Sequence, residues 1–165
     1  MDYNVLSDTR SLYIHWPFCP YRCHFCPFVA LAGQDHLMNR YHQAILKEIE
    51  QFAYRCPEKK IIETIYIGGG TPSTWPLPLL LDMFDRLGST FTLDNIKEIT
   101  LEVNPGTVDK EKLAVWKEAG ITRLSVGVQS LNDDVLKTLN RHQKVEVVHK
   151  LIEWSVGMFN SFSVD

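Results

Sequence analysis

The feature that most constrains the fold of this 165-residue chain is a regular alternation of short β-rich runs with longer helical patterns. Strands that alternate with helices of this length are typical of parallel βαβ units, which wind in a right-handed sense. The runs are mostly apolar, as expected for strands that are covered by helices. The pattern therefore predicts an α/β fold with a parallel sheet. Five strands are expected, at residues 12–16, 62–67, 98–103, 123–128 and 159–164.

Apolar residues at helical spacing fill the segments between these runs. Asp35, Thr107 and Asn132 are expected to cap three of the helices, and Gly120 is expected to end the helix that Thr107 begins. A last helix is expected at residues 145–157. Two closures of the sheet satisfy this pattern, a full or partial barrel and an open doubly wound sheet. Periodicity does not choose between them.

A chemically unusual segment follows each predicted strand. In α/β barrels and open sheets alike, ligands bind at the carboxyl ends of the strands. Five such segments on one rim would surround a common small molecule, so we expect them to form one site. They are the cysteine-containing residues 19–26, the GGGTPS sequence at 68–73, EVNP at 102–105, QS at 129–130, and Asp165.

The first of these segments holds three cysteines within eight residues, Cys19, Cys23 and Cys26. Three thiolates are one fewer than a 4Fe–4S cluster or a closed zinc site needs, so a cluster held here would keep one iron open. Zinc could instead take the three cysteines with His24 or His15, although no second pair of zinc ligands exists in the sequence. A thioredoxin-like pair would use only the last two cysteines. The spacing favours the cluster.

The other strand-end residues each have two interpretations. Glu102, a carboxylate near a strand end, is costly unless paired; it could accept hydrogen bonds from ribose hydroxyls or form a salt bridge with Arg123 or Lys97. Arg141 could bind a carboxylate through its planar fork or could compensate a helix dipole. The glycines at 68–70 lack the Lys-Ser/Thr of a phosphate-binding loop, and they indicate a tight turn or the close approach of a ligand.

Composition narrows the class of protein. A net charge of −3 without a Lys/Arg-rich stripe gives no electrostatic footprint for nucleic-acid binding. No apolar run approaches the ~18 residues of a membrane span. Residues 1–10 are polar and match neither a secretory signal nor a transit peptide, so we expect a reducing, cytoplasmic location. In that setting Cys56 is interpreted as an ordinary half-buried thiol.

Six motifs, taken in order, resemble those of one family. That family is the radical S-adenosylmethionine family of oxygen-independent coproporphyrinogen III dehydrogenase and the related heme chaperone. The resemblance covers essentially the whole chain, from residue 12 to residue 165. The motifs are YIHWPFC at 13–19, the cysteine triad at 19–26, GGGTP at 68–72, EVNP at 102–105, RLSVGVQ at 123–129 and LNRHQ at 139–143.

The resemblance implies the N-terminal part of a partial (β/α)6 TIM-like barrel, with parallel strands and about five βα units present. Residues 1–165 would form one incomplete radical S-adenosylmethionine core domain without the sixth strand and the C-terminal domain. The chain would then be a fragment of a protein more than twice as long, or a partner would complete it.

The same resemblance assigns two cofactors to the strand-end site. Cys19, Cys23 and Cys26 would hold a 4Fe–4S cluster, and the open iron would chelate S-adenosylmethionine. The residues that would bind S-adenosylmethionine are Tyr13, Phe25, Gly69, Gly70, Thr71, Glu102, Gln129, Arg141 and Asp165.

In such proteins a flavodoxin or ferredoxin-like donor reduces the cluster, and S-adenosylmethionine is then cleaved to methionine and a 5′-deoxyadenosyl radical. The dehydrogenase uses the radical to decarboxylate a porphyrinogen, whereas the chaperone branch binds heme and passes it to respiratory proteins. Phe28 stands where the dehydrogenase has a further cysteine, and only about ten residues precede the first strand. Both features favour the chaperone branch. An oxygen-independent coproporphyrinogen III oxidase and a non-enzymatic, zinc-binding module are the alternatives.

Overall fold

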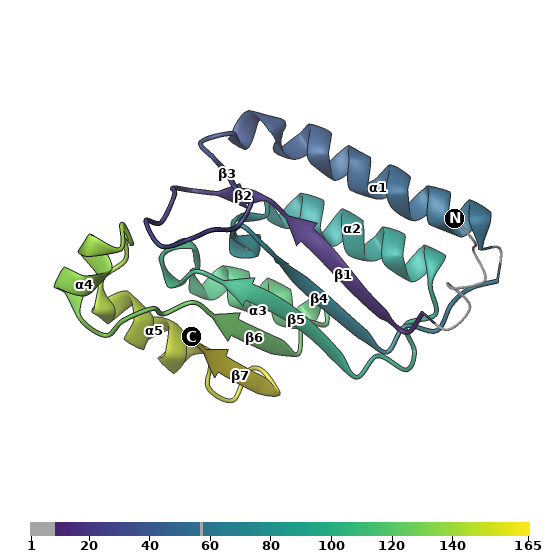
Figure 1. Ribbon diagram of the computed structural model, residues 1–165. Helices are drawn as coiled ribbons and strands as arrows, with labels where there is room; N and C mark the ends of the chain where they lie inside the picture. The colour runs from purple at the N-terminus through teal and green to yellow at the C-terminus, as the bar shows by residue number, and fades with distance from the viewer. Residues whose placement is uncertain (1–8, 57) are drawn as a thin grey trace.

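The computed structural model describes residues 9–56 and 58–165, and its centre is a five-stranded, wholly parallel sheet (Figure 1). The strands lie in chain order, β1-β4-β5-β6-β7, as expected for repeated βα units. A second sheet pairs two short strands at the end of β1. The predicted α/β class and parallel pairing are confirmed, while residues 1–8 of the polar leading segment lie outside the described residues. The main strands are β1 Ser11–Trp16, β4 Thr64–Gly69, β5 Glu98–Val103, β6 Arg123–Val126 and β7 Ser161–Val164, and the short ones are β2 Phe18–Cys19 and β3 Leu31–Ala32.

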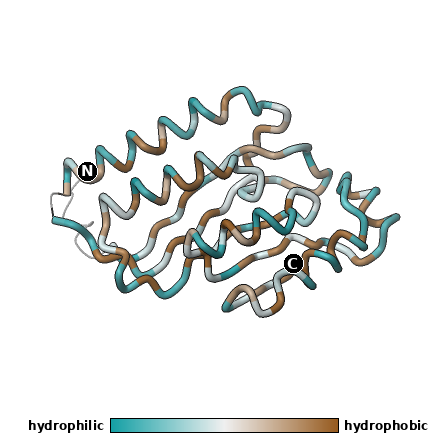
Figure 2. The backbone as a smooth tube through the Cα atoms, turned by 180° about the vertical axis from the view of Figure 1, so that it is seen from behind, coloured by the Kyte–Doolittle hydropathy of each residue, from teal (hydrophilic) through white to brown (hydrophobic). Residues whose placement is uncertain are grey.

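Helices connect the strands, and those of more than two turns carry an apolar stripe toward the sheet. Figure 2 shows hydrophobic and hydrophilic positions alternating along them. In the part of the chain that the structure describes, no helix has the length and apolar character needed to cross a bilayer. The α-helices are α1 Met38–Arg55, α2 Leu77–Thr90, α3 Lys110–Glu118, α4 Asp133–Thr138 and α5 Val145–Ser155, and the 3-10 turns are η2 Asp35–Leu37, η3 Pro72–Thr74 and η4 Pro105–Thr107.

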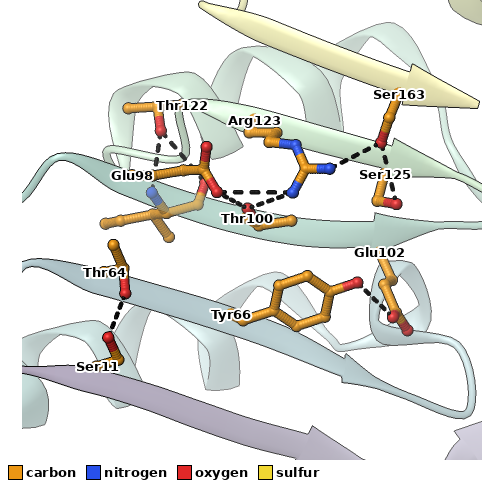
Figure 3. A network of polar contacts seen from close by, with 11 residues as sticks. Ser11, Thr64, Tyr66, Glu98, Thr100, Glu102, Thr122, Arg123, Ser125 and Ser163 are labelled. Atoms are coloured by element: carbon orange, nitrogen blue, oxygen red, sulfur yellow. Dashed lines mark hydrogen bonds and ion pairs between the residues drawn. The ribbon is translucent and has the colours of Figure 1, made fainter.

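The two faces of the sheet differ in character because successive strand side chains point to opposite sides. On one face, Ile65 and Leu101 are at most 1% exposed and belong to a core shared with α1, α2, α3 and α5. The opposite face carries polar side chains from neighbouring strands, among them Tyr66, Glu102 and Arg123 (Figure 3). The expectation of apolar strands covered by helices therefore holds for one face only.

Arg123 links three strands on the polar face. Its Nη1 donates to Thr100 Oγ1 at 3.3 Å and lies 3.6 Å from Glu98 Oε1 on β5, and its Nη2 donates to Ser163 Oγ on β7 at 3.0 Å. Ser163 Oγ in turn donates to Ser125 Oγ at 3.3 Å. These bonds tie β5, β6 and β7 together on the polar face of the sheet (Figure 3).

Two of the three predicted helix caps are wrong. Asp35 lies inside the 3-10 turn η2, and α1 begins after that turn without a side-chain cap. Thr107 lies in the 3-10 turn η4, three residues before α3 begins, and the Asp109 side chain caps that helix by accepting from the Lys112 N–H. The third prediction is confirmed, because the Asn132 side chain accepts hydrogen bonds from two backbone N–H groups of α4, at 2.9 and 3.2 Å.

Candidate functional site

A cavity of about 250 Å³ lies at the carboxyl ends of the parallel strands, where the five strand-end segments meet. Its walls come from the cysteine loop, from the segments that follow β4, β5 and β6, and from the end of the chain. The predicted convergence on one rim is confirmed. The predicted site residues that line the cavity are Cys19, Cys23, Phe25, Cys26, Gly69, Gly70, Thr71, Glu102, Gln129, Arg141 and Asp165.

Tyr13 is the one predicted site residue that the structure does not place on the cavity wall. Its ring lies on the polar face of the sheet, is 61% exposed, and stacks at a centroid distance of 6.1 Å on Tyr66. The Tyr13 hydroxyl lies 3.0 Å from His15 Nδ1. Tyr13 therefore borders the site from the neighbouring part of the sheet.

The three cysteines of the loop are free thiols on the cavity wall. Cys19 Sγ accepts a hydrogen bond from Thr71 Oγ1 at 3.2 Å, and burial raises the pKa of this thiol although the hydroxyl opposes the shift. Among the described residues, no three His, Cys, Asp or Glu side chains gather as ligands of one metal ion. A 4Fe–4S cluster makes a different demand, because each of its thiolates binds a separate iron.

Neither histidine that could complete a zinc site with the cysteines lines the cavity. His24 Nδ1 lies 2.9 Å from the Thr138 carbonyl oxygen, and His15 Nδ1 lies 3.0 Å from the Tyr13 hydroxyl. The donor set at the loop is therefore three thiols. That set fits a cluster with an open iron better than it fits a closed zinc site.

The glycines after β4 are required by both conformation and space. Gly69 has a φ of +122°, and a Cβ added there would lie 2.7 Å from the Trp16 carbonyl oxygen. A Cβ on Gly70 would lie 2.6 Å from the Pro17 carbonyl oxygen and 2.9 Å from Cys19 Sγ. The tight turn and the close approach are thus one feature, which brings bare backbone against the cysteine loop.

Glu102 is held by two neutral donors. Its Oε1 accepts from Tyr66 Oη at 2.7 Å (Figure 3). Its Oε2 accepts from the Gly69 N–H at 3.1 Å. The alternative of a salt bridge with Arg123 or Lys97 is wrong, because those two cations pair with other glutamates. Burial, followed by the bond to this carboxylate, raises the pKa of Tyr66 to about 12. Glu102 thus presents a fixed carboxylate to the cavity.

Arg141 extends into the cavity instead of toward the end of α4. Its Nη1 lies 3.8 Å from Cys23 Sγ, and its Nη2 donates to the Gly127 carbonyl oxygen. Its Nε is buried and has no hydrogen-bond partner among the described residues. This placement disagrees with dipole compensation and puts a positive charge beside the cysteine loop.

Gln129 joins the ends of β6 and β7. It adopts a left-handed φ of 69°, and its N–H donates to the Asp165 carbonyl oxygen at 2.8 Å. Both residues thereby reach the same wall of the cavity.

Polar residues near the cavity that were not predicted as site residues include Tyr66, which holds Glu102, and Tyr21 and Asn104, which line the wall. Two signals could have found them. Tyr66 lies two residues before Gly68, so it shares a strand face with the first residue of the GGGTPS motif. Tyr21 and Asn104 lie inside the strand-end motifs themselves.

Comparisons with known proteins agree with this geometry. The sequence pattern of the radical SAM superfamily matches residues 13–163. The heme chaperone HemW of Lactococcus lactis subsp. lactis is 30% identical over 162 residues, covering 98% of this chain and 41% of that protein. The HemW of Haemophilus influenzae is 34% identical over 161 residues, covering 94% of this chain and 42% of that protein. The chain therefore spans about two fifths of the length of these curated relatives.

A solved structure shares the fold. Coproporphyrinogen III oxidase HemN from Escherichia coli, described as a radical SAM enzyme, aligns with a TM-score of 0.81 and 28% identity. The alignment covers 93% of this chain and 36% of that one. This match selects the N-terminal part of a TIM-like barrel over the open sheet that periodicity had left possible. The superfamily's sequence pattern matches nearly the whole chain, and the residues of the strand-end site lie within or next to that match. The chain therefore belongs to the radical SAM superfamily.

Proposed function

We propose that the chain binds a 4Fe–4S cluster and S-adenosylmethionine side by side in the strand-end cavity, and that it acts in heme metabolism as a heme chaperone-like protein. The radical SAM family uses these two cofactors. One observation carries the proposal: the three free thiols share a cavity wall with a fixed carboxylate and a part-buried guanidinium. That combination offers partners to the amino group, the carboxylate and the ribose hydroxyls of S-adenosylmethionine.

The cysteine loop suits the cluster. Cys19, Cys23 and Cys26 would hold it, with Thr71 donating to the first sulfur. Arg141, 3.8 Å from Cys23 Sγ, would offset part of the negative charge that three thiolates bring. The absence of a fourth donor in this loop would leave one iron for the amino and carboxylate groups of the cofactor.

The rest of the wall suits S-adenosylmethionine. Glu102 would accept hydrogen bonds from the ribose hydroxyls, and the Arg141 fork would bind the carboxylate. Backbone carbonyls at Gly69 and Gly70 can approach the ammonium group because no Cβ intervenes. Gln129 and Asp165, which also line the cavity, would complete the binding site for S-adenosylmethionine. A cluster held by Cys19, Cys23 and Cys26 would supply, once an external donor had reduced it, the electron for reductive cleavage of S-adenosylmethionine.

The choice of heme as the ligand rests on the relatives and on Phe28. Relatives at 30% and 34% identity are named heme chaperones. Phe28, 68% exposed beside the cavity, stands where the decarboxylating branch of the family is expected to have a cysteine. An apolar ring there would pack against a porphyrin face. A cytoplasmic flavodoxin or ferredoxin-like donor and heme-accepting respiratory proteins complete the proposal.

The second candidate is oxygen-independent oxidation of coproporphyrinogen III. The observation that favours it is the match to the solved coproporphyrinogen III oxidase, at a TM-score of 0.81.

The test begins with anaerobic reconstitution of the chain with iron and sulfide. Electron paramagnetic resonance of the reduced protein should show a 4Fe–4S signal that changes when S-adenosylmethionine is added. Cys19→Ser should abolish the signal, whereas Cys56→Ser, outside the cavity, should retain it. Heme titration should then give stoichiometric binding. Conversion of coproporphyrinogen III without heme binding would favour the second candidate, and zinc in place of iron would overturn both.

A further inference from the structure

The cysteine loop (residues 19–26) is fastened to a distant segment, residues 138–143, which begins at the last residue of α4. His24 bonds to two carbonyls of that segment, through its N–H at 3.1 Å and with its ring Nδ1 at 2.9 Å. Asn140 Nδ2 donates to the Arg22 carbonyl oxygen at 2.6 Å, joining residues that are 118 positions apart in the chain. Tertiary contacts of this kind therefore set where the loop lies.

Tyr21 is at the centre of this attachment. Its hydroxyl accepts from Asn104 Nδ2 at 3.1 Å and from the His142 N–H at 3.3 Å, and it donates to Gln143 Oε1 at 3.2 Å. One donor and two acceptor sites are all that a phenol hydroxyl has, so its capacity is filled. The ring stacks on His142 with centroids 3.9 Å apart and planes at 24°. We call Asn104, His142 and Gln143 the Tyr21 socket.

The socket also restrains Arg141, because the socket residue His142 directly follows Arg141 in the chain. The guanidinium of Arg141 is 3.8 Å from Cys23 Sγ, and this contact joins the two segments at the cavity. The socket residue Asn104 belongs to the strand-end motif after β5, and its side chain is 5% exposed. Tyr21 therefore ties the cysteine loop both to the rigid end of β5 and to the segment that carries the arginine.

We infer that Tyr21 is a positioning residue, whose hydroxyl in its socket fixes the cysteine loop relative to Arg141. This inference rests on the proposed function in one respect: with both cofactors bound, the same contact would hold the cysteines at a fixed distance from Arg141, which would bind the carboxylate of S-adenosylmethionine. Loss of the hydroxyl leaves the ring stacked on His142 but frees the loop to open locally.

The first test uses the chain without any cofactor. Iodoacetamide alkylation of its four cysteines is followed site by site by mass spectrometry, in the parent chain and in Tyr21→Phe. Losing the hydroxyl should raise the alkylation rates of Cys23 and Cys26 roughly fivefold. Cys56, at the end of α1, should react at an unchanged rate and serves as the internal reference. Equal acceleration at Cys56 would mean that Tyr21 supports the whole fold, which would overturn the inference.

Two further variants sharpen the test. Asn140→Gly removes the bond to the Arg22 carbonyl while tolerating the φ of 56° at that position, and it should accelerate the same two cysteines. Tyr54→Phe removes a hydroxyl from a residue that is 90% exposed and should change none of the rates. Unchanged rates in both Tyr21→Phe and Asn140→Gly would overturn the inference.

A spectroscopic readout connects the socket to the cofactor. In reconstituted protein, Tyr21→Phe should keep its iron content but bind S-adenosylmethionine roughly fivefold more weakly, seen as a displaced titration of the paramagnetic resonance change. Parent-like affinity in a variant whose loop is more reactive would contradict the link to the cofactor. If the parent chain itself forms no cluster, the proposed function fails, whereas the alkylation rates still decide the role of Tyr21.

Discussion

Tyr66 Oη donates a 2.7 Å hydrogen bond to Glu102 Oε1, across the neighbouring strands β4 and β5 (Figure 3). The Gly69 N–H donates to the other oxygen of the same carboxylate at 3.1 Å. Glu102 is consequently oriented from two sides before any ligand arrives, with its remaining lone pairs available to the cavity. A preorganised carboxylate loses less side-chain freedom on binding, so Tyr66 should contribute to ligand affinity without touching the ligand.

The first prediction concerns Tyr66→Phe. The variant should fold, because the ring keeps its packing, and it should lose about 1 kcal/mol of unfolding free energy with the hydrogen bond. Its affinity for S-adenosylmethionine should fall roughly fivefold, since Glu102 becomes free to rotate. Equilibrium titration of the reconstituted chain measures this. An unchanged affinity would mean that the Gly69 N–H alone orients the carboxylate.

The second prediction is that the stability contributed by Tyr66 depends on pH, because the folded chain raises the pKa of this residue. Burial, then Glu102, raises the pKa of Tyr66 from 10.0 to about 12 in the folded chain. A raised folded pKa gives stability that is fully present below the unfolded pKa and is lost as the pH rises through the folded one. The stability difference between the parent chain and Tyr66→Phe should thus be constant below about pH 10 and should shrink between about pH 10 and 12. Urea unfolding across this range checks it, and a difference that grows with pH would contradict it.

The arrangement of elements could be predicted from the sequence because alternating strand and helix periodicities require a parallel sheet, whose strands end on one edge. This topology predicts that Cys19, Glu102 and Asp165 lie close together, and the structure places all three in one cavity. Element ends were less predictable. Strand β4 begins at Thr64 although the apolar run begins at Ile62, whose N–H donates to the Thr92 carbonyl oxygen outside the main sheet.

The partner of each polar group could not be predicted, because partners depend on register. A salt bridge to Arg123 was one interpretation of Glu102, but the β5–β6 register pairs Arg123 with Thr100 and pairs Glu102 with Ser125. Arg123 therefore bonds nearer the start of β5, and Glu102 is left to Tyr66 on the other neighbouring strand. Such choices follow from offsets of one or two residues, which a single sequence does not specify.

A third prediction tests the close approach of the glycine turn to the cysteine loop. In Gly70→Ala the new Cβ would meet the Pro17 carbonyl oxygen at 2.6 Å and Cys19 Sγ at 2.9 Å, so β2 must shift. We expect a loss of about 1–3 kcal/mol of unfolding free energy and strongly reduced cluster incorporation.

The matched control is Gly88→Ala in α2, where an added Cβ meets nothing within 4 Å. That change should stabilise the helix by about 0.5–1 kcal/mol and leave the cluster content unchanged. Iron analysis and thermal unfolding of both variants provide the measurement. Normal cluster content in Gly70→Ala would show that the loop tolerates displacement of Cys19.

A fourth prediction tests the helix cap at α3. Asp109 Oδ1 accepts from the Lys112 N–H at 2.8 Å, so Asp109→Ala should cost about 1 kcal/mol of unfolding free energy. Asp35→Ala is the comparison, since Asp35 caps no α-helix, and it should change stability by less than about 0.5 kcal/mol. Chemical denaturation of both variants would settle the difference, and equal losses would argue against the cap.

The last prediction separates the two interpretations of Arg141. The guanidinium uses one nitrogen beside Cys23 Sγ and another on the Gly127 carbonyl oxygen, so its planar fork covers two sites at once. Lysine keeps the charge but reaches a single site. Arg141→Lys should therefore keep its iron content and bind S-adenosylmethionine about tenfold more weakly. Arg86→Lys, at a surface pair with Glu50, should alter neither property. If charge near a helix end were what matters, lysine at position 141 would bind the cofactor as tightly as arginine does, because a dipole responds to charge and not to fork geometry.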